Sequence, residues 1–138
     1  MRVVLAACLS VVASAALSGC ASDGDTVGQG CTDAGRADTA AVASALQDLD
    51  PGAGTFTDCE SGMTTGAMID PFARAESFAG AERAFGDHFD CSTPQRSTNP
   101  VGDDVSDFTC TIAGVRAEVQ LDGDRDAGPV SAWVTPAG

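Results

Sequence analysis

The sequence predicts an α+β domain with a small antiparallel sheet of about four to five strands and two helices packed on one face. Side chains alternate between apolar and polar along the last third of the chain, which is typical of half-buried antiparallel strands. Two earlier segments carry apolar residues at helical spacing. Four cysteines between positions 31 and 110 indicate disulfides, which small exported domains commonly use.

The first predicted helix covers residues 38–49. Asp38 is suited to be its N-cap, because a carboxylate can accept hydrogen bonds from free backbone N–H groups. Apolar side chains then recur at i, i+4 and i+7: Val42, Leu46 and Leu49. The Asp-Pro-Gly sequence at 50–52 ends the helix.

Two short extended segments and a second helix are expected next. Residues 54–60 and 67–69 are typical of strands. Asp70 before Pro71 suits an N-cap and a first helical position, so the helix start lies between 71 and 77 and its end lies before Cys91. The apolar face of this helix consists of Phe78, Ala81, Phe85 and Phe89.

The C-terminal third predicts a three-stranded meander. Residues 108–112 and 115–121 alternate on either side of a tight turn, and residues 130–135 follow an acidic loop. The inward side chains of the last strand are Val130, Ala132 and Val134, which puts Trp133 on the opposite face. Residues 92–104 contain two prolines and many polar side chains, and we expect a long exposed loop there.

The first twenty residues have the pattern of an export signal. Arg2 precedes an uncharged apolar run over residues 3–17, which is too short for a permanent membrane span. The Leu-Ser-Gly-Cys sequence at 17–20 resembles the lipobox of bacterial lipoproteins. The resemblance implies cleavage before Cys20 and a diacylglyceryl group on its sulfur, with acylation of the new amino terminus in some bacteria. The alternative is an ordinary signal peptide, cut at a site such as residues 13–15.

The chain therefore divides into a signal peptide over 1–19, a lipidated Cys20 with a tether to residue 30, and one domain over 31–138. Residues 21–30 hold too few large apolar side chains to form a core. A flexible segment of this length reaches about 17 Å. The expected location is the outer face of the cell membrane, because two acyl chains are enough for stable anchoring.

The cysteines suggest a two-disulfide framework. Cys8 lies in the removable segment and Cys20 carries the lipid, which leaves Cys31, Cys59, Cys91 and Cys110. Four cysteines allow three connectivities, of which local pairing (31 with 59, 91 with 110) is favoured here. A zinc site is disfavoured because the spacings are wide and no C-x-x-C pair is present.

The net charge of −13 restricts the partners of the chain. A domain this acidic is repelled by nucleic acid and by anionic lipid, and it favours cationic partners or metal ions, although solubility alone is the commoner reason for such a charge. The expected membrane contact is therefore the lipid on Cys20. No cofactor is expected, because the sequence has neither a glycine-rich phosphate loop nor a lysine.

One acidic loop and one histidine are candidates for metal binding or catalysis. The acidic loop contains Asp122, Asp124 and Asp126 at alternate positions, as at the start of an EF-hand calcium loop. The glycine and the final glutamate of that pattern are missing, so an acidic hairpin loop is the simpler interpretation. His88 is the only histidine, lies on the second predicted helix and has no nucleophile motif beside it.

These observations predict a non-catalytic binding or interaction module of the cell envelope. The identity of its protein or ligand partner stays open, and an exposed Trp133 would mark a binding surface. One alternative is a cell-envelope hydrolase that uses a carboxylate pair. Another is an adhesion or stability module that depends on calcium.

Overall fold

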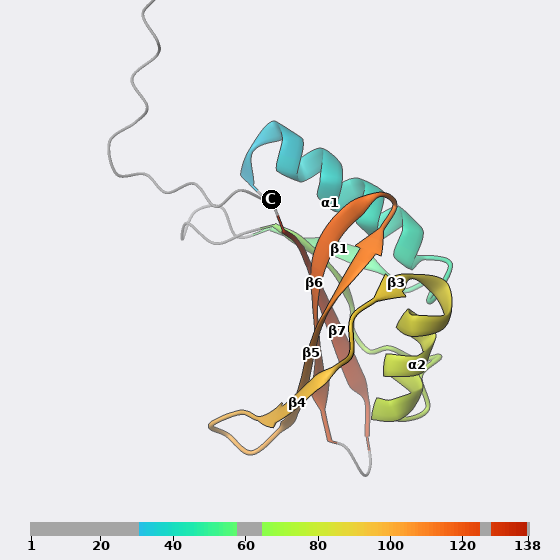
Figure 1. Cartoon of the computed structure of the whole chain (residues 1–138), viewed down its shortest axis with the longest axis vertical. Helices are drawn as coiled ribbons and strands as arrows, with labels where there is room; N and C mark the ends of the chain where they lie inside the picture. The colour runs from blue at the N-terminus through green and yellow to red at the C-terminus, as the bar shows by residue number, and fades with distance from the viewer. Residues whose placement is uncertain (1–30, 58–64, 125–127, 138) are drawn as a thin grey trace, which may run out of the picture.

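The structure of the chain is a computed structural model that describes residues 31–57, 65–124 and 128–137. Within these ranges the chain forms two helices and a seven-stranded antiparallel sheet, which confirms the α+β class (Figure 1). The elements are α1 (Asp33–Leu46), β1 (Gly54–Phe56), β2 (Gly66–Ile69), α2 (Phe78–His88), β3 (Asp90–Cys91), β4 (Gln95–Thr98), β5 (Asp104–Ile112), β6 (Val115–Gly123) and β7 (Val130–Pro136).

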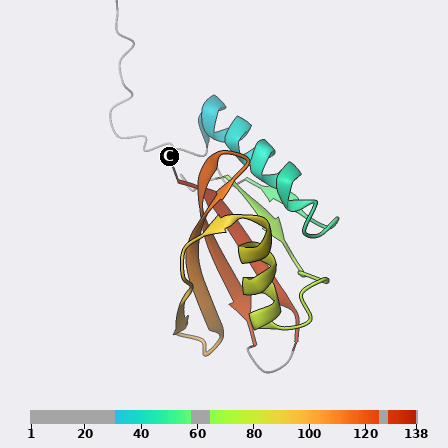
Figure 2. The ribbon, with the colours of Figure 1, turned by 45° about the vertical axis from the view of Figure 1, so that its right-hand side comes forward.

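The sheet order is β1-β2-β7-β6-β5-β3, and β4 pairs with the other half of β5. Both helices lie on the same face of the sheet, as two views of the ribbon show (Figures 1 and 2). The core between them contains these large, fully buried side chains: Val42, Leu46, Ile69, Phe72, Phe78, Phe85, Ile112, Val119, Leu121, Val130 and Val134. No helix of the described chain covers the other face (Figure 2).

Helix α1 begins five residues earlier than the sequence predicts, so the N-cap assigned to Asp38 was wrong. The N-cap is Thr32, whose Oγ1 accepts a hydrogen bond from the Gly35 backbone N–H at 3.0 Å. The first turn contains Gly35 and no large apolar side chain, so periodicity could not reveal it. The residues expected to be buried are correct, since Val42, Leu46 and Leu49 are all buried, but the helix ends at Leu46 rather than at residue 49 and Leu49 lies in the turn that follows.

Helix α2 is capped by Ser77, and the N-cap assigned to Asp70 was also wrong. Ser77 Oγ accepts from the Gly80 N–H at 3.0 Å. Asp70 instead accepts a hydrogen bond from Ser131 Oγ at 2.6 Å, and the Phe72 N–H donates to Val130 O at 2.7 Å. The segment before α2 is therefore attached to the sheet, and this is why the helix starts late.

The meander of β5, β6 and β7 is confirmed with the expected faces. Ala113 and Gly114 have φ of 51° and 77°, the left-handed values of a tight two-residue hairpin turn. Residues 117, 119 and 121 of β6 are buried, and residues 116, 118 and 120 are exposed. Side chains of the second set therefore point away from the helices.

The sheet has more strands than the four to five expected, and the loop assigned to 92–104 was partly wrong. All four side chains of β4 are exposed, so no apolar alternation marks this strand in the sequence. It is held by pairing with β5 and by Arg96, whose Nε donates to Glu82 Oε1 on α2 at 3.0 Å. Hydrogen bonds to the Glu82 carboxylate, together with its charge, raise the pKa of Arg96. Glu82 also accepts from the buried Ser106 at 2.8 Å, which connects α2 to β5.

One predicted disulfide is confirmed. Cys91 on β3 and Cys110 on β5 lie directly opposite each other and are bonded. This bridge attaches the chain that follows α2 to the long central strand. Cys31 is buried, but Cys59 lies outside the described residues, so their pairing stays a prediction.

Candidate functional site

The uncovered face of the sheet brings polar side chains from four strands into two rows. The pairing register places Trp133 of β7 beside Gln120 of β6, then Asp107 of β5 and Gln95 of β4. A second row, two residues further along each strand, runs through Thr135, Glu118 and Thr109. Side chains in a row stand on neighbouring strands about 4.8 Å apart, so both rows can contact one ligand.

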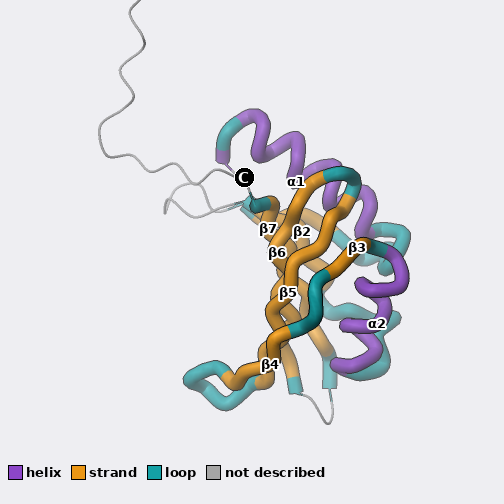
Figure 3. Tube along the Cα trace, in the orientation of Figure 1, coloured by secondary structure: helices purple, strands orange, loops and turns teal. Residues whose placement is uncertain are grey.

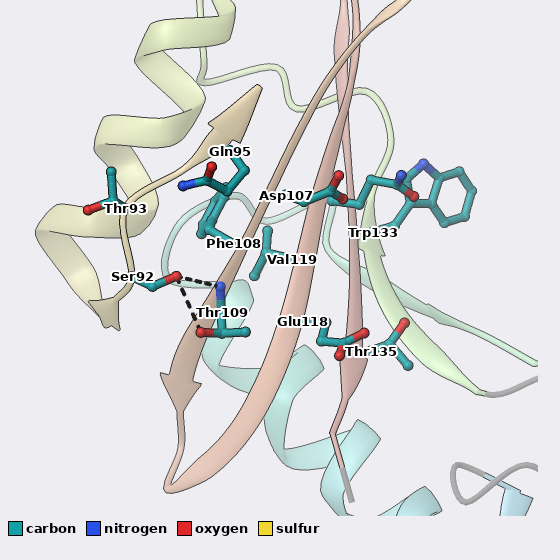
Figure 4. Close-up of a pocket in the computed structure, with 11 residues that line it drawn as sticks. Ser92, Thr93, Gln95, Asp107, Phe108, Thr109, Glu118, Val119, Trp133 and Thr135 are labelled. Atoms are coloured by element: carbon teal, nitrogen blue, oxygen red, sulfur yellow. Dashed lines mark hydrogen bonds between the residues drawn. The ribbon is translucent and has the colours of Figure 1, made fainter. Parts of the chain in front are cut away.

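These rows line an open pocket of about 570 Å³. The volume lies within the range of small-molecule sites. Figure 4 shows Trp133 at one side of the pocket and Ser92 and Thr93 at the other. The described lining consists of Ser92, Thr93, Gln95, Asp107, Phe108, Thr109, Glu118, Val119, Gln120, Trp133 and Thr135. Hydroxyl, amide and carboxylate groups therefore surround the space, and one indole closes a side of it.

The two carboxylates of the pocket come from different strands. Asp107 pairs with Gln120, and Glu118 pairs with Thr109, so the two acids are diagonal neighbours across β5 and β6. Both are exposed. Of the described residues that line the pocket, none is an arginine or a histidine, so the charge of the lining is negative.

Trp133 is held in place by an aromatic neighbour on the same face. Its indole meets the Phe56 ring edge to face, with ring centres 5.3 Å apart. Phe56 lies over Gly66, where an added Cβ would be 2.6 Å from the phenyl ring and 2.8 Å from the Val134 carbonyl oxygen. The glycine therefore leaves the space in which Phe56 supports Trp133. Such an arrangement gives the indole a defined orientation at the pocket.

The opposite side of the pocket is fixed by hydrogen bonds. Ser92 Oγ accepts from the Thr109 backbone N–H at 3.0 Å and from the Thr109 hydroxyl at 3.3 Å (Figure 4). These bonds lie where β3 has ended and β4 has not begun, as the loop between the two strands in Figure 3 shows. The break lets Ser92 and Thr93 contribute to the lining.

The residues singled out in the sequence lie elsewhere or outside the described chain. Cys20 and Asp126 are outside the described residues, so the lipid site and the calcium loop stay predictions. Asp122 lies on β6 and Asp124 directly follows it. His88 is exposed at the end of α2, where its Nδ1 donates to Ala84 O at 3.0 Å. Among the described residues, no group of three or more His, Cys, Asp or Glu side chains could hold a metal ion.

Sequence reasoning identified Trp133 and the outward face of β6, but it missed Asp107 and the pocket. The alternation along β6 places Glu118 and Gln120 on one face and was a sufficient signal for that strand. Asp107 joins them only through the pairing of β5 with β6. Ser92 and Gln95 join only through β3 and β4, which carry no apolar pattern.

Comparisons with known proteins identify no relative of this chain. No protein-family model matches the chain, and neither a curated protein nor a solved structure matches it. Within the part of the chain that the structure describes, no helix has the length and apolar character needed to cross a membrane.

Proposed function

We propose that the chain is an exported lipoprotein whose domain is a non-catalytic binding module on the outer face of the cell membrane. The location rests on Arg2, the apolar run and the Leu-Ser-Gly-Cys sequence at 17–20. The disulfide between Cys91 and Cys110 supports it, since such bonds persist in oxidising compartments. The proposed framework includes a second disulfide between Cys31 and Cys59.

Removing the lipid acceptor tests the location. We expect Cys20→Ser to leave the protein unprocessed or released, because serine has no thiol for the diacylglyceryl group. Cell fractionation and the mass of the mature chain measure this, and Cys8→Ser is the matched control that keeps lipidation. A Cys20→Ser protein that is still cut before residue 20 and still pellets with membranes would contradict the proposal.

The pocket on the uncovered sheet face is the observation that carries the proposed binding function. It combines an oriented indole with hydroxyl, amide and carboxylate groups, most of them on strands, which hold binding groups more precisely than loops do. The main ligand contact is Trp133, because amphipathic aromatic side chains dominate many binding sites.

A hydrolase that uses a carboxylate pair is the second candidate, because Asp107 and Glu118 line the same pocket. Binding is preferred over catalysis, since both acids are exposed and a general acid works best in a desolvated position. Turnover of glycan or peptide substrates that Glu118→Gln abolishes would favour the hydrolase.

Trp133 is the only tryptophan and the chain has no tyrosine, so its fluorescence reports directly on the pocket. We expect a saturable change in emission with at least one member of a panel of organic cations, neutral oligosaccharides and short peptides. Calorimetry with Trp133→Ala should then show at least a tenfold weaker affinity, corresponding to about 1.4 kcal/mol. Val101→Ala, at an exposed position far along the β4 hairpin, is the control. Binding that Trp133→Ala leaves unchanged would exclude this pocket as the site.

A further inference from the structure

The two carboxylates of the pocket form no ion pair with an arginine or a histidine in the part of the chain that the structure describes. Neither Asp107 nor Glu118 takes part in a described ion pair, whereas Glu82 and Asp33 do. Arg116 lies two residues from Glu118 on the same face of β6 and lines an adjoining hollow that shares Ser92 and Thr109 with the pocket, but no described ion pair joins it to Glu118. A chain of net charge −13 attracts cations, and the two carboxylates on this face give a positive ligand two points of negative charge.

From this arrangement, and on the basis of the binding function proposed above, we infer that the pocket binds a small organic dication with ammonium or guanidinium groups on an aliphatic chain. Asp107 and Glu118 each provide a charge partner, and they are diagonal neighbours on paired strands. One charged group therefore contacts each acid. The indole of Trp133, on the neighbouring strand β7, provides an apolar surface beside these two acids for the aliphatic part of the ligand.

Trp133 contributes in a second way. Its register partner is Gln120, and Glu118 lies two residues from Gln120 on the same face, so the indole and this acid border the same space. A cation near an indole is attracted by the negative face of the ring. The amide groups of Gln95 and Gln120 and the hydroxyls of Thr109 and Thr135 can accept the remaining N–H donors.

The size of the pocket favours a small molecule over a basic peptide. Its volume of about 570 Å³ is that of a small-ligand site. From β7 to β4 the lining crosses three strand intervals, a width of about 14 Å. A neutral saccharide could stack on Trp133, but it would leave both carboxylates without a positive partner.

Titration of the full chain in a neutral detergent with 1,5-diaminopentane tests the inference, with Trp133 fluorescence as the readout. We expect saturable binding that weakens as sodium chloride is raised. The double variant Asp107→Asn/Glu118→Gln should bind at least tenfold more weakly. The matched control is Glu76→Gln/Asp87→Asn, which also raises the net charge by two, from −13 to −11, at exposed positions away from the pocket. This control should keep the affinity within about twofold of wild type, because neither residue lines the pocket and exposed charges are screened by salt.

Four outcomes would overturn the inference. They are an equal loss of diamine affinity in both double variants, an unchanged diamine affinity in Asp107→Asn/Glu118→Gln, tighter binding of tetralysine than of the diamine, and displacement of the diamine by calcium chloride at equal concentration. If only a neutral oligosaccharide binds and Trp133→Ala abolishes that binding, the binding module stands and the dication is excluded. If no ligand of the panel changes the fluorescence of Trp133, the proposed function is excluded as well.

Discussion

Replacing Phe85 by alanine is expected to lower the free energy of unfolding by about 3–5 kcal/mol, the cost typical of removing a buried aromatic side chain. Phe85 is fully buried in the middle of α2. Its ring centre lies 6.0 Å from that of Phe72, 5.6 Å from Phe108 and 6.1 Å from Phe89. The cavity would open where α2, the preceding segment and β5 meet.

Urea unfolding followed by circular dichroism measures this effect. Arg83→Ala, at an exposed position of the same helix, is the matched control and should change stability by less than about 0.5 kcal/mol. The loss of stability in Phe85→Leu should lie between those of Phe85→Ala and Arg83→Ala, because leucine leaves a smaller cavity than alanine. A Phe85→Ala protein as stable as the control would show that α2 does not pack on the sheet in this way.

Removal of the Cys91–Cys110 bridge is expected to cost about 3 kcal/mol, because the bond closes a loop of about 20 residues in the unfolded chain. The double variant Cys91→Ala/Cys110→Ala makes this change without burying a new polar group. The same measurement applies, and the effect should appear as a lower unfolding midpoint. Since β3 and β4 are short and lie at the sheet edge, they are the elements that this bridge stabilises most.

Thr111→Ala is the control for the bridge, because Thr111 is an exposed neighbour on β5. It should leave the midpoint within about 0.5 kcal/mol of wild type. If the double alanine variant unfolds at the wild-type midpoint, the loop-closure account of this disulfide is wrong.

Some residues of the candidate site can be predicted from the pattern of a single strand, and others are identified only by the pairing of strands. Alternation along β6 and β7 was enough to place Glu118 and Trp133 away from the core, because the side-chain period of a strand is two. The two-residue turn at 113–114 sets the register between β5 and β6 and so brings Asp107 next to them, but the strand expected at 108–112 did not include Asp107. Gln95 lies on β4 and Ser92 directly follows β3, and these short strands have no apolar alternation by which the sequence could predict them.

The amino-acid sequence by itself determined the α+β class, the meander and the buried residues of the helical segments, because periodicity decides them. It left three disulfide connectivities open, and the structure decided the Cys91–Cys110 pair. The tertiary structure alone decided the start of both helices, since Thr32 and Ser77 are caps whose first turns lack an apolar pattern. It also decided the sheet order, with β2 beside β7, and hence the pocket. Such contacts join residues far apart in the chain, and their partners are selected by packing of the whole sheet rather than by any local sequence signal.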